Sequence, residues 1–213
     1  MESERAVDRL IFFTDAVVAI AITLLILPLV EIVNQFANEH RTVESFLYDN
    51  LSQMFAFALS FVIIARVWIA NHEILANTVR ATAALIWIDF AWVFTVVVIP
   101  LPTEITAAFP RSELTVLIYA GCASANALLL TAMSFYLFRH PGLQTKPISR
   151  TLIWGGASNA AGFLLAIALV LIVPSVGYYS LLILVLTLPF DRIVKPRIAR
   201  REIARREAAR AAE

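Results

Sequence analysis

Long apolar runs separated by short polar segments set the pattern of this sequence. Six such runs lie at residues 9–31, 51–71, 83–103, 113–138, 151–173 and 177–194. A helix needs roughly 20 apolar residues to cross the hydrocarbon core of a bilayer. The runs are longer than barrel strands and do not alternate with period two, so helices satisfy their backbone groups in lipid. The sequence therefore predicts an all-α integral membrane protein with six transmembrane helices.

Prolines and glycines mark the expected ends of these spans. Pro100 and Pro102 end the third span, and Pro141 with Gly142 follows the fourth. The longest connection outside the membrane is expected over the polar stretch 34–49. Two parts result: a six-helix transmembrane unit over residues 1–190 and a charged C-terminal helix over residues 191–213.

Basic residues lie on one side of this predicted topology. The opposite loops hold only Arg41 and Arg111. Because lysine and arginine are retained on the cytoplasmic side, both termini are predicted to face the cytoplasm. The cytoplasmic side then carries Arg5, Arg9, Arg80, Arg139, Lys146, Arg150 and the basic tail.

Composition narrows the classes of function. The 213 residues are 60% hydrophobic and 15% charged with a net charge of +1, so nothing indicates a nucleic-acid partner. The basic tail is expected to bind anionic lipid headgroups. Cys122 is the only cysteine, and no metalloprotease, hydrolase or phosphate-loop pattern occurs. We therefore expect no enzyme activity, no metal site and no cofactor.

Charged side chains inside spans are costly and usually functional. Asp15 lies in the first span, Arg66 and His72 in or beside the second, and Asp89 in the third, all toward the predicted cytoplasmic side. We expect a buried network that joins these three spans, because an ionised carboxylate there needs a partner. From the residues alone, a packing clamp and a contact with a passing ion are both open.

The first span also carries an apolar stripe. Ile20, Leu24 and Leu27 share one helical face, and Thr23 lies beside them. The small residues Ala16 and Ala19 lie one turn below, where close helix approach is possible. The spacing alone favours a stripe that faces lipid or the protein core, although hydrophobic rings also form constrictions in channels.

The segment from Arg9 through Phe13, Thr14 and Asp15 to Ala16 resembles the first-helix signature of the transmembrane protein 175 family of potassium channels. Two further segments are similar to its second helix (Ser60-Phe61, then Trp68 and His72) and its third (Trp87-Ile88-Asp89, then residues 99–103). The sequence departs from the family at Thr14, where Ser is usual, at Asp89, where Asn is usual, and at Asn71, where relatives often have His.

The resemblance implies a tetrameric, moderately potassium-selective channel in the plasma membrane of a prokaryote, because members with a single six-helix unit form homotetramers. Their pore is lined by the first helices and has no carbonyl filter. The constriction falls by position on Ile20, followed by Thr23, Leu24 and Leu27. The inner polar network would hold the pore helix in place and comprises Arg9, Phe13, Thr14, Asp15, Trp68, His72 and Asp89. The permeant ion is K+.

Two other functions remain open. A proton-permeable or proton-coupled path would use Asp15, His72 and Asp89, because transporters relay protons through such groups. A non-conducting membrane scaffold would instead depend on the basic tail. Substitution of Ile20 discriminates these alternatives from the channel, which alone requires that residue.

Overall fold

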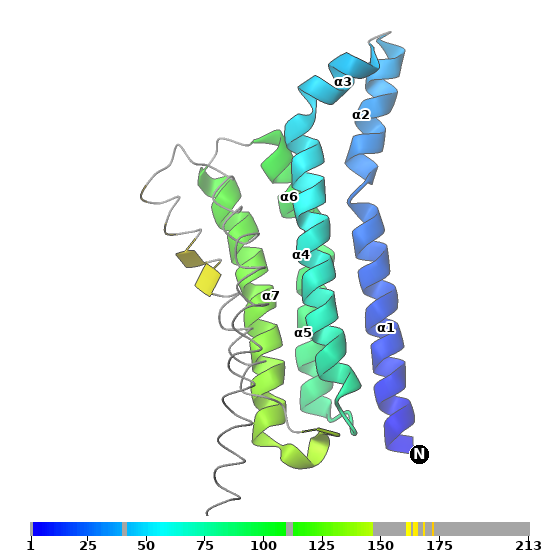
Figure 1. Ribbon diagram of the computed structural model, residues 1–213, viewed down its shortest axis with the longest axis vertical. Helices are drawn as coiled ribbons and strands as arrows, with labels where there is room; N and C mark the ends of the chain where they lie inside the picture. Colours follow the sequence, from blue (N-terminus) through cyan, green and yellow to red (C-terminus); the bar gives the residue numbers. More distant parts are fainter. Residues whose placement is uncertain are drawn as a thin grey trace, which may run out of the picture.

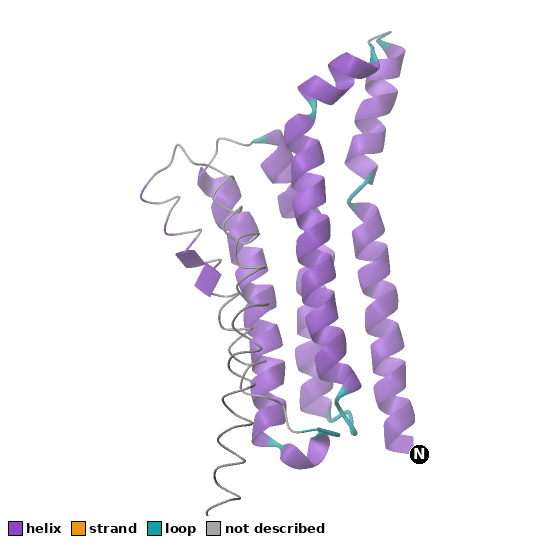
Figure 2. Cartoon of the chain, in the orientation of Figure 1, coloured by secondary structure: helices purple, strands orange, loops and turns teal. Residues whose placement is uncertain are grey.

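The computed structural model describes residues 2–39, 42–109 and 113–146, with isolated positions between 161 and 172. Over these residues the chain is helical, and the elements lie roughly side by side in an elongated bundle (Figures 1 and 2). The helices are α1 (Glu2–Leu24), α2 (Leu27–Asn38), α3 (Val43–Asp49), α4 (Leu51–Ala76), α5 (Ala83–Val98), α6 (Pro100–Ala108), α7 (Glu113–Arg139) and the short 3-10 helix η1 (Pro141–Leu143). We call the end of the bundle with the start of α1 and the loop 77–82 the basal end.

Four segments of the described chain are long and apolar enough to cross a membrane: Arg5–Asn38, Leu51–Ala76, Ala83–Thr106 and Leu117–Arg139. They coincide with the first four predicted spans. The expected fifth and sixth spans and the C-terminal helix lie outside the described residues. The helical, membrane-spanning class is therefore confirmed, whereas the count of six and the orientation of the termini stay predictions.

Prolines restart helices here as well as end them. The first predicted span breaks at Leu25 and Ile26, because Pro28 has no N–H to donate back along the helix, and α2 then begins. Pro100 likewise occupies the start of α6, so the chain continues as a helix to Ala108 beyond the predicted end of the third span.

The polar stretch 34–49 is more helical than the pattern predicted. Helix α2 runs on to Asn38, and α3 begins after Thr42, whose hydroxyl accepts a hydrogen bond from the backbone N–H of Ser45 at 3.3 Å. The rings of Phe36 and Phe46 meet edge to face at 5.5 Å. The expected connection is thus a helical hairpin at the end of the bundle opposite the basal end (Figure 1).

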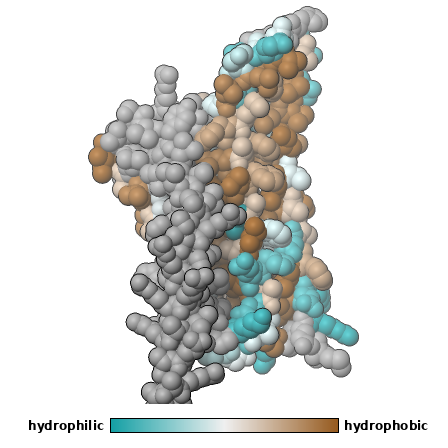
Figure 3. Space-filling model, in the orientation of Figure 1, coloured by the Kyte–Doolittle hydropathy of each residue, from teal (hydrophilic) through white to brown (hydrophobic). Residues whose placement is uncertain are grey.

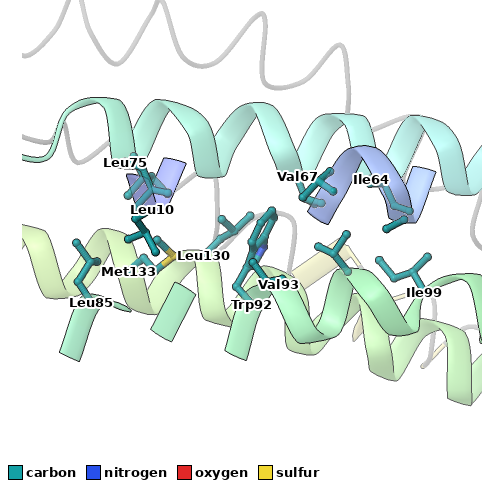
Figure 4. Packing of buried hydrophobic residues seen from close by; sticks show 14 of the residues in the cluster. Leu10, Ile64, Val67, Leu75, Leu85, Trp92, Val93, Ile99, Leu130 and Met133 are labelled. Atoms are coloured by element: carbon teal, nitrogen blue, oxygen red, sulfur yellow. The ribbon is translucent and has the colours of Figure 1, made fainter. Parts of the chain in front are cut away.

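The core lies between α1, α4, α5 and α7. Helix α1 packs on α4 and α5, and α7 packs on the same two helices from the other side. Trp92, Ile64, Leu85 and Met133 are fully buried between them (Figure 4). In the coloured part of Figure 3, hydrophobic residues cover most of the upper and middle surface, and hydrophilic residues gather at the upper tip and toward the basal end. The cross-section is therefore a diamond with α1 at one corner.

Candidate functional site

A buried polar triad joins the pore-helix candidate α1 to α4 and α5. The Thr14 hydroxyl donates to Oδ2 of Asp89 at 2.7 Å, and Nδ2 of Asn71 donates to Oδ1 of the same carboxylate at 2.8 Å. All three residues are 0% exposed. Both hydrogen-bond partners of the Asp89 side chain in the described chain are neutral, so this carboxylate is held by hydrogen bonds rather than by a facing cation.

The side-chain amide of Asn71 has one further contact and one unsatisfied acceptor besides its bond to Asp89. Its Nδ2 also lies 3.7 Å from the sulfur of Met133 on α7. Its Oδ1 is buried with no hydrogen-bond partner among the described residues. A buried acceptor without a donor costs free energy, so the triad is a less than fully satisfied network at the meeting point of α1, α4, α5 and α7.

A second cluster surrounds Asp15, the next residue along α1. The Trp68 indole Nε1 donates to Oδ1 of Asp15 at 2.7 Å, and Nδ1 of His72 lies 3.5 Å from Oδ2. The side chains of His72 and Asp15 are partly exposed, and the rings of Trp68 and His72 are 5.7 Å apart. Asp15 is therefore held against α4 in a site that water reaches.

The position of α1 over the groove between α4 and α5 explains why adjacent residues serve different helices. Successive residues of an α-helix point about 100° apart. Thr14 accordingly meets Asp89 of α5, while Asp15 meets Trp68 of α4. Two adjacent residues of α1 thus bond this helix to both α5 and α4.

Two other predicted members of the network lie at its margin. Phe13 is exposed, and its ring lies tilted against that of Phe90 of α5, with ring centroids 5.2 Å apart. Arg9 is exposed, and in the described chain no hydrogen bond or ion pair joins it to Asp15 or Asp89. The structure therefore places Thr14 and Asp89 in one cluster and Asp15, Trp68 and His72 in a neighbouring one, and it leaves Arg9 outside both.

The predicted constriction residues lie on a face of α1 and α2 that the other described helices leave uncovered. Ile20 is 60% exposed, and Leu24 and Leu27 are also exposed. The Thr23 hydroxyl donates to the backbone carbonyl of Ile20 at 2.8 Å, so it is bonded to its own helix. Within one copy, this stripe presents apolar surface and one partly satisfied hydroxyl to its surroundings.

Sequence reasoning missed two buried polar clusters. The Ser60 hydroxyl lies 2.8 Å from that of Thr103 and 3.0 Å from that of Tyr119, which joins α4, α6 and α7. In the other cluster, Trp92 donates to the Asn126 side chain at 3.0 Å, linking α5 to α7. The available signal was the presence of isolated hydroxyl and amide groups within long apolar runs.

No group of three or more metal-ligating side chains occurs in the part of the chain that the structure describes. Cys122 on α7 is a half-buried free thiol whose sulfur lies 3.7 Å from the Thr95 carbonyl oxygen. The candidate site therefore consists of the exposed apolar stripe that contains Ile20 and of the two clusters around Asp15 and Asp89.

Comparison with known proteins gives a family match over the first three spans. The model of the family "Endosomal/lysosomal potassium channel TMEM175" matches residues 9–100. A potassium channel of Streptomyces collinus is 29% identical over 131 residues, covering 60% of this chain and 62% of that protein. The zebrafish (Danio rerio) endosomal/lysosomal proton channel TMEM175 is 23% identical over 142 residues, covering 66% of this chain and 27% of that protein.

Solved structures give the same fold. A lysosomal potassium-selective channel TMEM175 homolog from Chamaesiphon minutus matches with a TM-score of 0.70 at 23% identity, covering 89% of this chain and 98% of that one. A variant of the potassium channel MtTMEM175 matches with a TM-score of 0.59 at 20% identity, covering 91% and 93%. The chain spans less than two thirds of the length of the curated relatives described above.

Proposed function

We propose, from the premise that residues 9–100 belong to the TMEM175 family, that the chain forms a potassium-permeable channel and is not an enzyme. The pore is built by four copies, each of which contributes α1. Ile20 forms the constriction, with Thr23, Leu24 and Leu27 following it. The observation that carries the proposal is the exposed apolar stripe on α1, the helix with the family's signature. The bacterial relatives named as potassium channels support the choice of ion.

The physics of such a ring favours potassium moderately. Four symmetry-related Ile20 side chains make a narrow apolar constriction that offers no oxygen ligands. A weakly hydrated cation loses less free energy on passing it than a strongly hydrated one does. Coordinating carbonyls discriminate more sharply, so the proposed selectivity is moderate. The channel needs no cofactor, and K+ is bound only in transit.

The polar clusters would fix the pore helix. Thr14 bonds α1 to α5, and Asp15 bonds it to α4, both below the constriction. A pore helix anchored at two points keeps its apolar stripe turned toward the axis. The protein would lie in the plasma membrane of a prokaryote, with both termini in the cytoplasm and the basic tail on anionic headgroups.

Ion flux through purified protein in liposomes tests this function. Potassium and sodium gradients of equal size are compared while the internal and external pH are held equal. The proposal expects a faster potassium flux that depends on Ile20. Equal background leakage of both ions, matched by protein-free liposomes, would contradict it.

A proton path is the second candidate. The structure brings Asp15 and His72 to 3.5 Å, and Asp89 bonds to the adjacent Thr14. The zebrafish relative is named as a proton channel. Proton flux in potassium-free liposomes that is lost in Asp15→Asn or His72→Ala, yet retained in Ile20→Asn, would favour this path over the potassium channel.

A further inference from the structure

Two exposed stripes flank α1. On one side, residues spaced three and four apart continue from α5 into α6, with Trp87 74% exposed and Phe94 68% exposed. On the other side, α4 exposes smaller side chains among large ones. We define the α5–α6 stripe as Trp87, Phe90, Phe94, Val97 and Leu101, and the α4 stripe as Ala58, Phe61, Val62, Ile69 and Ala76.

We propose that these stripes are the two halves of the contact between neighbouring copies: the α5–α6 stripe of one copy packs on the α4 stripe of the next. The inference rests on the proposed function, because it takes α1 to face a fourfold axis. It goes further by naming the surfaces that bring four α1 helices to that axis.

The diamond cross-section leads to this pairing. Helix α1 packs on both α4 and α5, which flank it. When the free face of α1 points to a central axis, the flank formed by α4 meets the flank formed by α5 of the adjacent copy. A ring closes only through such a head-to-tail contact, in which two different surfaces meet.

The two stripes match in depth, and the α4 stripe offers room for close approach at its ends. The α4 stripe has alanine at both ends, and small residues allow close helix approach in membranes. Ile69 lies seven residues from Ala76, the basal end of α4, and Phe90 lies seven residues from Ala83, the basal end of α5. At about 1.5 Å of rise per residue, both lie about 10 Å above the basal end. Val62 and Val97 match in the same way at fourteen residues.

Charge at the basal end agrees with the pairing. Glu73 is exposed in the last turn of α4, and Arg80 is exposed in the loop before α5. They have opposite charges at the same end of the bundle, and over the described ranges no ion pair joins either side chain to another residue of the same copy. In the proposed contact, Glu73 of one copy meets Arg80 of the next. If lipid alone covered these faces, opposite charges at Glu73 and Arg80 would not be needed.

Disulfide trapping between differently tagged copies tests the contact. In a Cys122→Ser background, one copy has Val62→Cys and the other has Val97→Cys, and the two are co-expressed and oxidised in native membranes. A disulfide requires the two Cα atoms to approach within roughly 7 Å. The proposal expects a cross-linked dimer that contains both tags, and none when either variant is expressed alone.

A matched control replaces Val62→Cys with Leu128→Cys, an exposed position on α7 at the far corner of the diamond. This control is expected to give no cross-link with Val97→Cys. The pair Ile69→Cys and Phe90→Cys samples the same contact at a second depth. Failure of both pairs in a tetramer that conducts potassium would overturn the contact and leave the proposed function standing. Absence of both a tetramer and flux would overturn the two together.

Charge reversal gives an independent readout. Glu73→Arg and Arg80→Glu should each lower the fraction of tetramer after dilution in detergent, and the double variant should restore it. If instead the stripes face lipid, the single variants leave the tetramer fraction unchanged. A membrane-soluble maleimide then labels Val97→Cys as fast in the tetramer as in the dissociated chain, and either result would contradict the contact.

Discussion

At the residue scale, the bond between Trp68 and Asp15 ties α1 to α4. The indole donates to a carboxylate at 2.7 Å in a partly exposed site. Trp68→Phe keeps the aromatic ring and removes this donor. We expect a loss of about 1.5 kcal/mol in the free energy of unfolding, near the lower end for hydrogen bonds to charged groups.

Denaturant titration of the purified protein in mild detergent measures this loss. Tyr48→Phe is the control, because Tyr48 is exposed on α3, away from both stripes, and no hydrogen bond of its hydroxyl is found in the described chain. The control should change the stability by less than about 0.5 kcal/mol. Equal effects of the two substitutions would contradict the role given to Trp68.

The departure at Asp89 provides a second residue-scale test. Asp89→Asn restores the residue usual in the family and keeps the shape, so the Thr14 hydroxyl still finds an acceptor. The proton path requires the carboxyl group, whereas the potassium pore does not. We expect potassium flux in liposomes to persist in Asp89→Asn. Loss of potassium flux in a correctly folded tetramer would show that the carboxylate itself serves conduction.

How far the sequence predicts this site depends on the residue. Charge inside an apolar run identified Asp15, His72 and Asp89 as residues that need partners, and the structure distributes them over two neighbouring clusters rather than one network. Which oxygen bonds to which donor could not be predicted, since it depends on the rotation of α1 over the groove. Arg9 was expected in the network, but the structure leaves it exposed on α1, more than one turn before Thr14.

At the scale of the element, apolar length predicted the helices, and proline chemistry decided their breaks. Pro28 and Pro100 each begin a new helix, which hydropathy alone does not distinguish from an end. The hydroxyl cluster of Ser60, Thr103 and Tyr119 was not predictable, because the three residues come together only once α4, α6 and α7 are packed.

This cluster makes an element-scale prediction. Ser60→Ala removes a partner from both Thr103 and Tyr119 and leaves the Tyr119 hydroxyl buried without its bond, at a cost of about 1 to 3 kcal/mol. Tyr119→Phe leaves Ser60 bonded to Thr103 and should cost less. Thermal unfolding of both variants in one detergent measures the order, and the reverse order would contradict the bridging role of Ser60.

At the scale of the whole molecule, the proposed pore requires more than one copy. The stripe that contains Ile20 and the stripes on either side of α1 are apolar and uncovered. Hydropathy predicted that these residues lie in the membrane, but it does not distinguish surfaces covered by lipid from those covered by another copy. We expect light scattering in detergent to give a protein mass of about 94 kDa, four times the 23.6 kDa of one chain. A mass of one or two chains in a conducting preparation would contradict the tetramer.

The reversal potential of Ile20→Asn under opposed potassium and sodium gradients tests the central claim most directly. An amide in place of the apolar side chain wets the constriction and offers oxygen to both ions. The account predicts that the potassium-to-sodium permeability ratio falls toward one. The control Val33→Asn makes the same apolar-to-amide substitution at an exposed residue of α2 and should leave the ratio unchanged. An unaltered ratio in Ile20→Asn, with flux intact, would contradict a pore whose constriction is formed by α1 at Ile20.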